Sequence, residues 1–395
     1  MTSDALRAWR LSYTDEELQW RSADWRSEQS EWRAEREQQR RERRRRDRRY
    51  FGVGLNSQNL SRRALNEKKL TAQNLPILKN EKALAEWLNV ELSRLRWYTY
   101  NQTTSSVYHY VRYVLPKRSG GQRVILAPKT GLKAIQRKIL AEILNKIVLT
   151  EPAHGFRKGR NIVTNASPHA GKPFVLNLDL KEFFPSITFR RVRGLFTGLG
   201  YGYTIASVLA LLCTESDREM IQRPDRPYYA GLSPRALVQG APTSPALANL
   251  AARRLDKRLA GLAVKRGVTY TRYADDLTFS GEDRDVLFKL MKTAGHIIAA
   301  EGFTVHPKKT RFYQRGQRQI VTGLVVNDKV NTPRQMRRQV RAILHNAAQT
   351  GLNAQNRMNH PNFRGYVLGL IAHIGQTAPD LAATFRGQLV ALSDS

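Results

Sequence analysis

The chain of 395 residues contains a single cysteine, Cys213, and no apolar run long enough to cross a bilayer. One cysteine cannot form an internal disulfide, and it excludes a zinc site built from clustered cysteines. Residues 205–213 are apolar, but about 20 such residues are needed to span a membrane. The N-terminus also lacks the pattern of a secretory signal peptide. We therefore expect a cytoplasmic protein without membrane contact, with Cys213 in its core.

Acidic residues are scarce as well. The chain has 33 Asp and Glu against 66 Lys and Arg, which gives a formal net charge of +33. Residues 1–50 hold 14 Arg and 11 Asp or Glu, a net of +3, so the remainder carries +30 (33 − 3). A body this basic predicts a polyanionic partner, most simply nucleic acid held along a large surface. Hydrophobic residues make up 41% of the chain, which is enough for a packed core.

The first 60 residues differ in composition from the rest. Thr14 and Glu17 fit a capping box, and neither Gly nor Pro follows before Arg49. Four apolar residues recur every seven positions: Leu11, Leu18, Trp25 and Trp32. Their companion positions are polar, so only half of a coiled-coil seam is present. We interpret residues 1–60 as a charged, Trp- and Arg-rich helical extension that docks onto the protein body, RNA or a partner.

Two adjacent carboxylates occupy the corner of a predicted β-hairpin. Residues 268–271 and 277–280 are rich in β-branched and aromatic residues, and between them lie Tyr273, Ala274, Asp275 and Asp276. Asp179 follows another apolar run. Three carboxylates that meet at strand ends would suit a pair of divalent cations, roughly 3.5–4 Å apart, that promote phosphoryl transfer. A solvated Asp-Asp turn is the alternative interpretation of the tetrapeptide alone.

Two glycine-containing segments are candidates for binding a ligand. In residues 239–245, Gly240 allows close approach of the backbone, and two prolines direct the chain into a helix near residue 246. Residues 108–115 and 123–126 predict a hairpin around Gly120 and Gly121. Cations at this hairpin, Arg123 among them, would close over a triphosphate. Solvated surface is the alternative for each cation taken singly.

The order of these segments resembles the palm motifs of reverse transcriptases: Asp179, then QGAPTSP at 239–245, then YADD at 273–276. The likeness extends from about residue 95 to about residue 345, and it is closest to bacterial retron reverse transcriptases. Residues 165–169 match the retron NAxxH element, and residues 321–323 match its VTG element.

The resemblance implies a fold and its division into domains. It implies an α+β right-hand polymerase with fingers at 61–171, a palm at 172–325 and a helical thumb at 326–395, after the N-terminal helical extension. The palm would be an antiparallel sheet backed by helices, and it would carry the catalytic acids.

The resemblance also implies residue roles. Asp179, Asp275 and Asp276 would be the catalytic acids and metal ligands, with Asp275 acting more directly than Asp276. Phe184 matches the position of a steric gate that favours dNTPs over rNTPs. The other nucleotide-binding residues would be Arg123, Gln239, Gly240 and Lys309. Residues that hold primer or RNA would be Tyr273, Asn165, His169, Val321, Thr322 and Gly323.

A helix predicted from about residue 332 has two contrasting faces. Its basic face carries Arg334, Arg338, Arg341 and His345. Its apolar face carries Met336, Val340, Ile343 and Ala347. A basic stripe opposite an apolar stripe suits a thumb that lies along a duplex, although an ordinary amphipathic surface helix has the same pattern.

The function implied by the resemblance is that of a retron RNA-directed DNA polymerase, a nucleotidyltransferase that uses dNTPs and two Mg²⁺ ions, with Mn²⁺ as a substitute. It would copy a dedicated structured non-coding RNA into a branched, RNA-linked single-stranded DNA (msDNA), starting from the 2′-hydroxyl of an internal guanosine. An antiphage role, an effector protein and a separate RNase H follow from the same resemblance.

Two alternatives remain open. The chain could be a reverse transcriptase of another bacterial group, from a group II intron or a diversity-generating element. It could also be an RNA-binding scaffold that restrains an effector protein. An intact trio of acids favours the enzyme, because a scaffold gains nothing from converging carboxylates.

Overall fold

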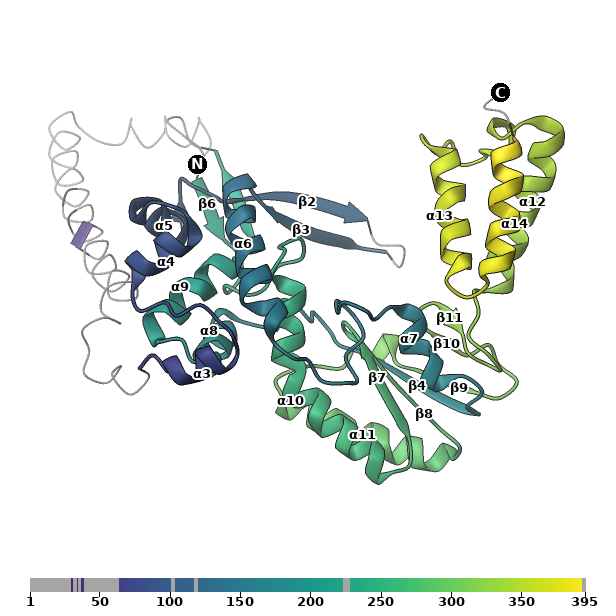
Figure 1. Cartoon of the computed structure of the whole chain (residues 1–395), viewed down its shortest axis with the longest axis horizontal. Helices are drawn as coiled ribbons and strands as arrows, with labels where there is room; N and C mark the ends of the chain where they lie inside the picture. The colour runs from purple at the N-terminus through teal and green to yellow at the C-terminus, as the bar shows by residue number, and fades with distance from the viewer. Residues whose placement is uncertain are drawn as a thin grey trace, which may run out of the picture.

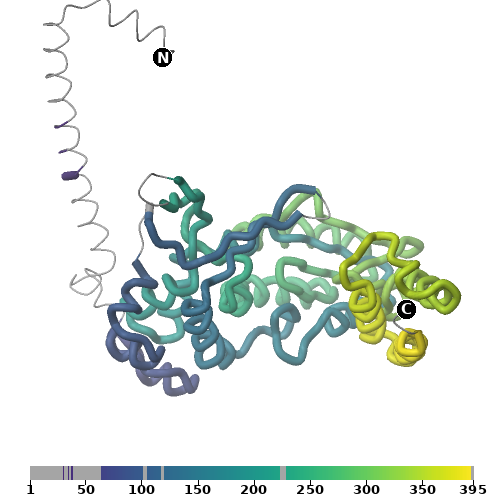
Figure 2. The backbone as a smooth tube through the Cα atoms, turned by 90° about the horizontal axis from the view of Figure 1, so that it is seen from above, coloured from purple at the N-terminus to yellow at the C-terminus, as the bar shows by residue number. Residues whose placement is uncertain are grey.

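The computed structural model describes residues 64–100, 104–116, 120–222 and 228–392, together with four separate residues near the N-terminus: Ser30, Ala34, Glu37 and Gln38. These four are helical and exposed. The rest of the predicted N-terminal extension lies outside the described residues. In the described part the chain is elongated, with residues 64–100 at one end and the helices of residues 334–392 at the other (Figures 1 and 2).

A four-stranded antiparallel sheet forms the centre of the molecule, with the strand order β7-β8-β4-β9. Its strands are β4 (Phe174–Asp179), β7 (Thr269–Tyr273), β8 (Asp276–Gly281) and β9 (Arg311–Gln314). Most residues of β4 and β8 are buried, because both faces of the sheet are covered. Successive side chains of a strand point to opposite faces, so Leu176 and Leu178 join the main core, whereas Val175 joins a smaller core on the other face.

Two helices cover the main-core face of this sheet: α10 (Ser244–Lys265) and α11 (Arg284–Ala300). Helix α11 has a side-chain cap at its N-terminus and a glycine just past its C-cap. Its start is set by Asp283, whose side chain accepts hydrogen bonds from the backbone N–H groups of Asp285 and Val286. Gly302, with φ of 74°, follows the C-cap residue.

The main core continues well beyond the sheet. It extends from Leu70 to Phe303 and includes side chains of these helices: α3 (Glu67–Ala72), α4 (Glu81–Leu88), α5 (Leu92–Thr99), α6 (Thr130–Glu142), α8 (Phe189–Leu199) and α9 (Tyr203–Cys213). This cluster includes residues on both sides of residue 172, the predicted boundary between fingers and palm. The apolar run 205–213 forms α9, and Cys213 at its end is fully buried, as expected. In the described ranges, no helix has both the length and the apolarity that crossing a membrane requires.

Smaller sheets lie beside the core. A hairpin of β2 (Tyr110–Pro116) and β3 (Gln122–Pro128) projects from the body toward the side of the C-terminal helices (Figure 1). A three-stranded sheet has the order β1-β6-β5, formed by β1 (Thr104–Ser105), β5 (Arg218–Ile221) and β6 (Tyr228–Gly231).

The C-terminal helices have a core of their own. They are α12 (Arg334–Thr350), α13 (Phe363–Gly375) and α14 (Pro379–Ala391). Their shared cluster includes Val340, Ile371 and Phe385, and it is separate from the main core. Between the two, α7 (Ile162–Ala166) packs on the short strands β10 (Ile320–Val321) and β11 (Leu324–Val325).

Candidate active site

The three predicted acids lie at one corner of the central sheet. Asp179 ends β4 and is the direct partner of Asp276, the first residue of β8, in the antiparallel ladder. Residues that face each other in such a ladder have Cα atoms about 4.5–5.5 Å apart. Asp275 belongs to the two-residue connection between β7 and β8, and its carbonyl accepts a hydrogen bond from the Leu180 N–H at 3.0 Å. The structure therefore brings together carboxylates that are 96 residues apart in the sequence (275 − 179).

Loss of hydration, together with like charges, makes proton loss unfavourable at this corner. Loss of hydration raises the pKa of Asp275. A hydrogen bond from the residue's own backbone N–H offsets part of this rise, and the charge of Asp179 adds to it. The side chain of Asp276 is exposed, yet protein atoms around its carboxylate reduce hydration. This loss of hydration, followed by the charges of Asp275 and Asp179, raises the pKa of Asp276 to about 7. Such a corner attracts cations.

A lysine already neutralises part of this charge. Lys309 Nζ lies 3.0 Å from Oδ1 and 2.9 Å from Oδ2 of Asp179. The hydrogen bond with Asp179 raises the pKa of Lys309, so the ammonium stays charged. Lys309 and Arg123 both lower the pKa of Asp275 through their charges, which places both cations within electrostatic reach of the acids.

The acids suit a hard divalent cation by their chemistry. Across the described ranges, no three His, Cys, Asp or Glu side chains already form a ready metal cluster. Carboxylate oxygens are nevertheless the ligands that Mg²⁺ prefers, and Mg²⁺ retains waters and uses substrate phosphates, so few protein ligands are needed. Asp179, Asp275 and Asp276 would hold the ion, with Asp179 exchanging its contact with the Lys309 ammonium for the metal.

A fully buried ion pair holds the acidic turn in place. Arg272 donates to Asp256 through Nε and Nη2, both at 2.7 Å, and neither side chain is accessible to solvent. Asp256 also accepts hydrogen bonds from the hydroxyls of Tyr270 at 3.0 Å and Thr150 at 2.9 Å. Arg272 Nη1 donates to the Ala274 carbonyl at 2.9 Å. The buried charges are therefore compensated, and one of them holds the residue that precedes Asp275.

The turn itself is strained and tightly packed. Ala274 has φ of 58°, a left-handed conformation that costs a non-glycine residue about 1–2 kcal/mol. The segment before α7 runs along the edge of β7, where Arg272 N–H donates to the Pro152 carbonyl at 2.7 Å. A Cβ atom added to Gly155 would come within 2.5 Å of the Ala274 nitrogen. Only glycine allows this backbone to lie so close to the acids.

The predicted QGAPTSP segment lies against the base of the β2–β3 hairpin. Leu126 N–H donates to the Gln239 carbonyl at 2.7 Å. Gly240 has φ of 112°, and a Cβ atom there would lie 2.8 Å from the Leu126 carbonyl oxygen. Glycine is thus required for both conformation and space. Arg123 is on the same strand, so the hairpin and the loop are positioned together.

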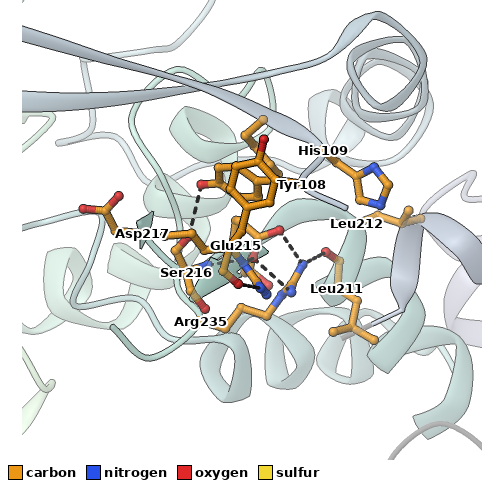
Figure 3. Close-up of polar contacts among 12 residues, drawn as sticks. Tyr108, His109, Leu211, Leu212, Glu215, Ser216, Asp217 and Arg235 are labelled. Atoms are coloured by element: carbon orange, nitrogen blue, oxygen red, sulfur yellow. Dashed lines mark hydrogen bonds and ion pairs between the residues drawn. The ribbon is translucent and has the colours of Figure 1, made fainter. Parts of the chain in front are cut away.

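Figure 3 shows a polar cluster that fixes this region and that our sequence analysis missed. Buried Glu215 forms ion pairs with Arg218 at 3.3 Å and Arg235 at 3.2 Å. Tyr108 lies just before β2, and its hydroxyl donates a hydrogen bond to the Ser216 carbonyl at 3.3 Å. Residue 235 immediately precedes the strand-like segment that leads to Gln239. No local sequence signal marks Glu215 as a partner of Arg235, which is 20 residues away.

The NAxxH and VTG elements pack together, and most of their side chains are enclosed. Asn165, His169 and Val321 are fully buried. The His169 ring nitrogens lie 2.7 Å from the Ser280 hydroxyl and 2.8 Å from the Thr271 hydroxyl, and burial lowers the pKa of His169 to about 3. The role of these three residues in holding RNA stays a prediction, and as buried side chains they would serve it only by positioning the accessible tip of the VTG turn.

The remaining predicted residues are accessible. Thr322, with φ of 47°, is half-buried, and Gly323 is exposed at the tip of the same turn. Tyr273 and Phe184 are half-buried. On α12, Arg334, Arg338 and Arg341 are exposed, whereas Val340 and Ala347 are buried, so the helix has the two faces that its sequence predicts.

Comparison with known proteins identifies the family. Residues 115–339, more than half of the chain, match the family model "Reverse transcriptase (RNA-dependent DNA polymerase)". The chain is 44% identical over 337 residues to the retron Mx65 reverse transcriptase of Myxococcus xanthus, covering 85% of this chain and 77% of that protein. It is 37% identical over 286 residues to the retron Ec86 reverse transcriptase of Escherichia coli, covering 71% and 82%.

A third relative is the retron Mx162 reverse transcriptase of Myxococcus xanthus, 40% identical over 83% of this chain and 70% of that protein. Among solved structures, the foamy viral protease-reverse transcriptase in complex with double-stranded DNA is similar with a TM-score of 0.44 and 15% identity, over 72% of this chain and 39% of that chain. The chain is thus an RNA-directed DNA polymerase of the reverse transcriptase family, and within that family it belongs to the retron reverse transcriptases.

Replacing Asp256 by Asn tests the buried ion pair. The substitution leaves Arg272 charged and without its counter-ion, so we expect the free energy of unfolding to fall by about 3–5 kcal/mol. Chemical denaturation followed by circular dichroism measures this. Glu282→Gln is the control, because its ion pair with Lys172 is at the surface and is worth at most about 1 kcal/mol. Equal losses for the two variants would contradict the prediction.

Proposed function

We propose that this enzyme copies a dedicated structured non-coding RNA into a branched, RNA-linked single-stranded DNA, using dNTPs and two Mg²⁺ ions, with Mn²⁺ as a substitute. The observation that carries the catalytic part is the pairing of Asp179 with Asp276 beside Asp275. When bound, the two ions would activate the attacking hydroxyl and neutralise the charge of the leaving pyrophosphate.

Each side chain around the acids has a proposed role. Asp179, Asp275 and Asp276 act as ligands, while Arg123 on the β2–β3 hairpin binds the triphosphate. Gln239 and Gly240 line the nucleotide beneath that hairpin. Lys309, which reaches Asp179 at 2.9 Å, lies near the position where the leaving phosphate gains charge. Tyr273 supports the primer end.

We propose the same division into domains as the sequence predicts. Fingers would comprise residues 61–171, the palm 172–325 and the thumb 326–395. The separate core of α12, α13 and α14 supports an independent thumb. The exposed arginines of α12, Arg334, Arg338 and Arg341, would contact phosphates of the RNA–DNA duplex. Thr322 and Gly323 would meet the structured RNA at the accessible tip of their turn.

The wider role is proposed from the retron relationship alone. DNA synthesis would start from the 2′-hydroxyl of an internal guanosine, and a separate RNase H would remove the template. The RNA–DNA product, bound to the enzyme, would restrain an effector protein that acts against phage.

Removal of one acid tests the catalytic assignment. Asp275→Asn should reduce primer extension on an RNA template by at least about 1000-fold, because a neutral amide cannot replace a metal-binding carboxylate. RNA affinity, measured by filter binding, should stay within about twofold, since phosphate contacts lie elsewhere. Asp283→Asn is the matched control, because asparagine also caps α11 well. Extension at the wild-type rate by Asp275→Asn would show that the metal-site assignment is wrong.

Phe184 provides a second test. Phe184 follows Asp179 by five residues, which is the position of the proposed steric gate. Phe184→Ala should therefore open space beside the sugar and raise incorporation of rNTPs relative to dNTPs by at least about tenfold. Single-nucleotide extension with each substrate measures the ratio. An unchanged ratio would contradict the gate role.

Nucleic acid that copurifies with the protein tests the retron assignment. We expect one small structured RNA covalently joined to single-stranded DNA when the protein is expressed with its flanking genomic region. Sequencing after phenol extraction, with and without ribonuclease, detects the junction. Recovery of bulk cellular RNA without attached DNA would contradict a dedicated template, while leaving the polymerase activity intact.

A further inference from the structure

Phe156 combines an exposed aromatic ring with a strained backbone conformation. It is 46% exposed, and its backbone has φ of 59°, in the left-handed region. This region is uncommon for any residue except glycine and is especially unfavourable for a bulky one. An exposed ring gains little from burial that could compensate for the strain. Strain of this kind persists where the surroundings enforce it, and it concentrates at functional sites.

Both neighbours of Phe156 are anchored to the support of the acidic turn. The Gly155 carbonyl accepts a hydrogen bond from Asn249 Nδ2 at 2.8 Å, and its backbone packs on Ala274. Arg157 Nη1 donates to the Thr150 carbonyl at 2.9 Å. The backbone on both sides of the left-handed residue is therefore anchored.

The ring of Phe156 contacts the ring of Phe184. Their centroids are 6.1 Å apart and their planes are tilted by 45°. Phe184 also lies 5.8 Å from Phe183, which is buried and packs against Phe303 at 5.6 Å. Phe184 therefore contacts both a buried aromatic pair and the exposed ring of Phe156.

We propose that Phe156 is a positioning residue for sugar selection, and that it holds the Phe184 ring against the sugar of the incoming nucleotide. This inference rests on the proposed role of Phe184 as the steric gate. A gate discriminates against a 2′-hydroxyl only as far as its ring resists displacement. Phe183 limits movement toward the core, and Phe156 limits movement toward solvent. Selection of dNTPs is then a property of the aromatic pair.

The test measures sugar discrimination, the ratio of kcat/KM for a dNTP to kcat/KM for the matching rNTP. Phe156→Ala should lower this ratio by about 2- to 12-fold, equivalent to the 0.5–1.5 kcal/mol of an aromatic pair. Phe156→Gly also removes the ring but relieves the left-handed strain, so it should fold at least as stably and lose the same discrimination. Phe156→Leu retains most of the bulk and should restore most of the ratio.

A double-mutant cycle separates positioning from direct contact. Adding Phe156→Ala to Phe184→Ala should change the ratio by less than about twofold, because Phe156 has no gate left to hold. Phe288→Ala is the matched control. Phe288 is 40% exposed and its ring is 4.6 Å from that of Phe312, but it belongs to α11 and should leave discrimination unchanged.

Distinct results would overturn this inference and the gate role. If Phe184→Ala lowers discrimination while Phe156→Ala and Phe156→Gly do not, the gate stands and the positioning role of Phe156 fails. Equal losses of kcat/KM for dNTP and rNTP would reduce Phe156 to a structural residue. Fully multiplicative effects in the double variant would indicate independent contact with nucleic acid instead. If Phe184→Ala itself leaves the ratio unchanged, the proposed gate fails, and this inference fails with it.

Discussion

Antiparallel pairing of β4 with β8 makes Asp179 and Asp276 direct neighbours although their charges repel. The register cannot shift to relieve this repulsion, because a slip of one residue would move Leu176 and Leu178 out of the main core. Burial of apolar side chains along the strands therefore stabilises an arrangement that is electrostatically unfavourable at its end. The repulsion between these carboxylates favours the binding of cations at the site.

The surrounding structure holds the corner without neutralising it permanently. The Arg272–Asp256 pair is sealed from solvent and compensates only itself, so it can support Ala274 without competing for a metal. Lys309, by contrast, is about half exposed, and its long side chain can leave Asp179 when another cation arrives. Permanent support and exchangeable charge are thus carried by different residues, one buried and one at the surface.

Strained residues gather around the same corner. Ala274, Phe156 and Glu182 all have positive φ. Ala274 precedes Asp275, Glu182 follows β4, and Phe156 lies in the segment that runs along β7. Backbone conformations of this kind require neighbours that leave no alternative, and here glycines such as Gly155 and Gly240 allow those neighbours to come close. The rigidity of the site therefore depends on backbone packing as much as on side chains.

The NAxxH and VTG elements show how residues that mark a family can lie inside the fold. We expected both elements to help hold RNA. His169 packs against the sheet, Val321 belongs to a small core, and the tip of the VTG turn remains accessible. Any support that these two buried side chains give to RNA binding would therefore depend on how they position that turn.

The sequence alone determined features that depend on near neighbours: the acidic two-residue turn between strands, the two faces of α12 and the basic charge of the body. Propensity, periodicity and capping act over a few residues, so they can be recognised without the fold. Only the tertiary structure decided that Asp256 compensates Arg272, that Glu215 binds Arg235, that His169 is enclosed, and that Phe156 meets Phe184. These contacts join segments that are brought together by burial of the whole core, and no local pattern encodes which distant residue will face which.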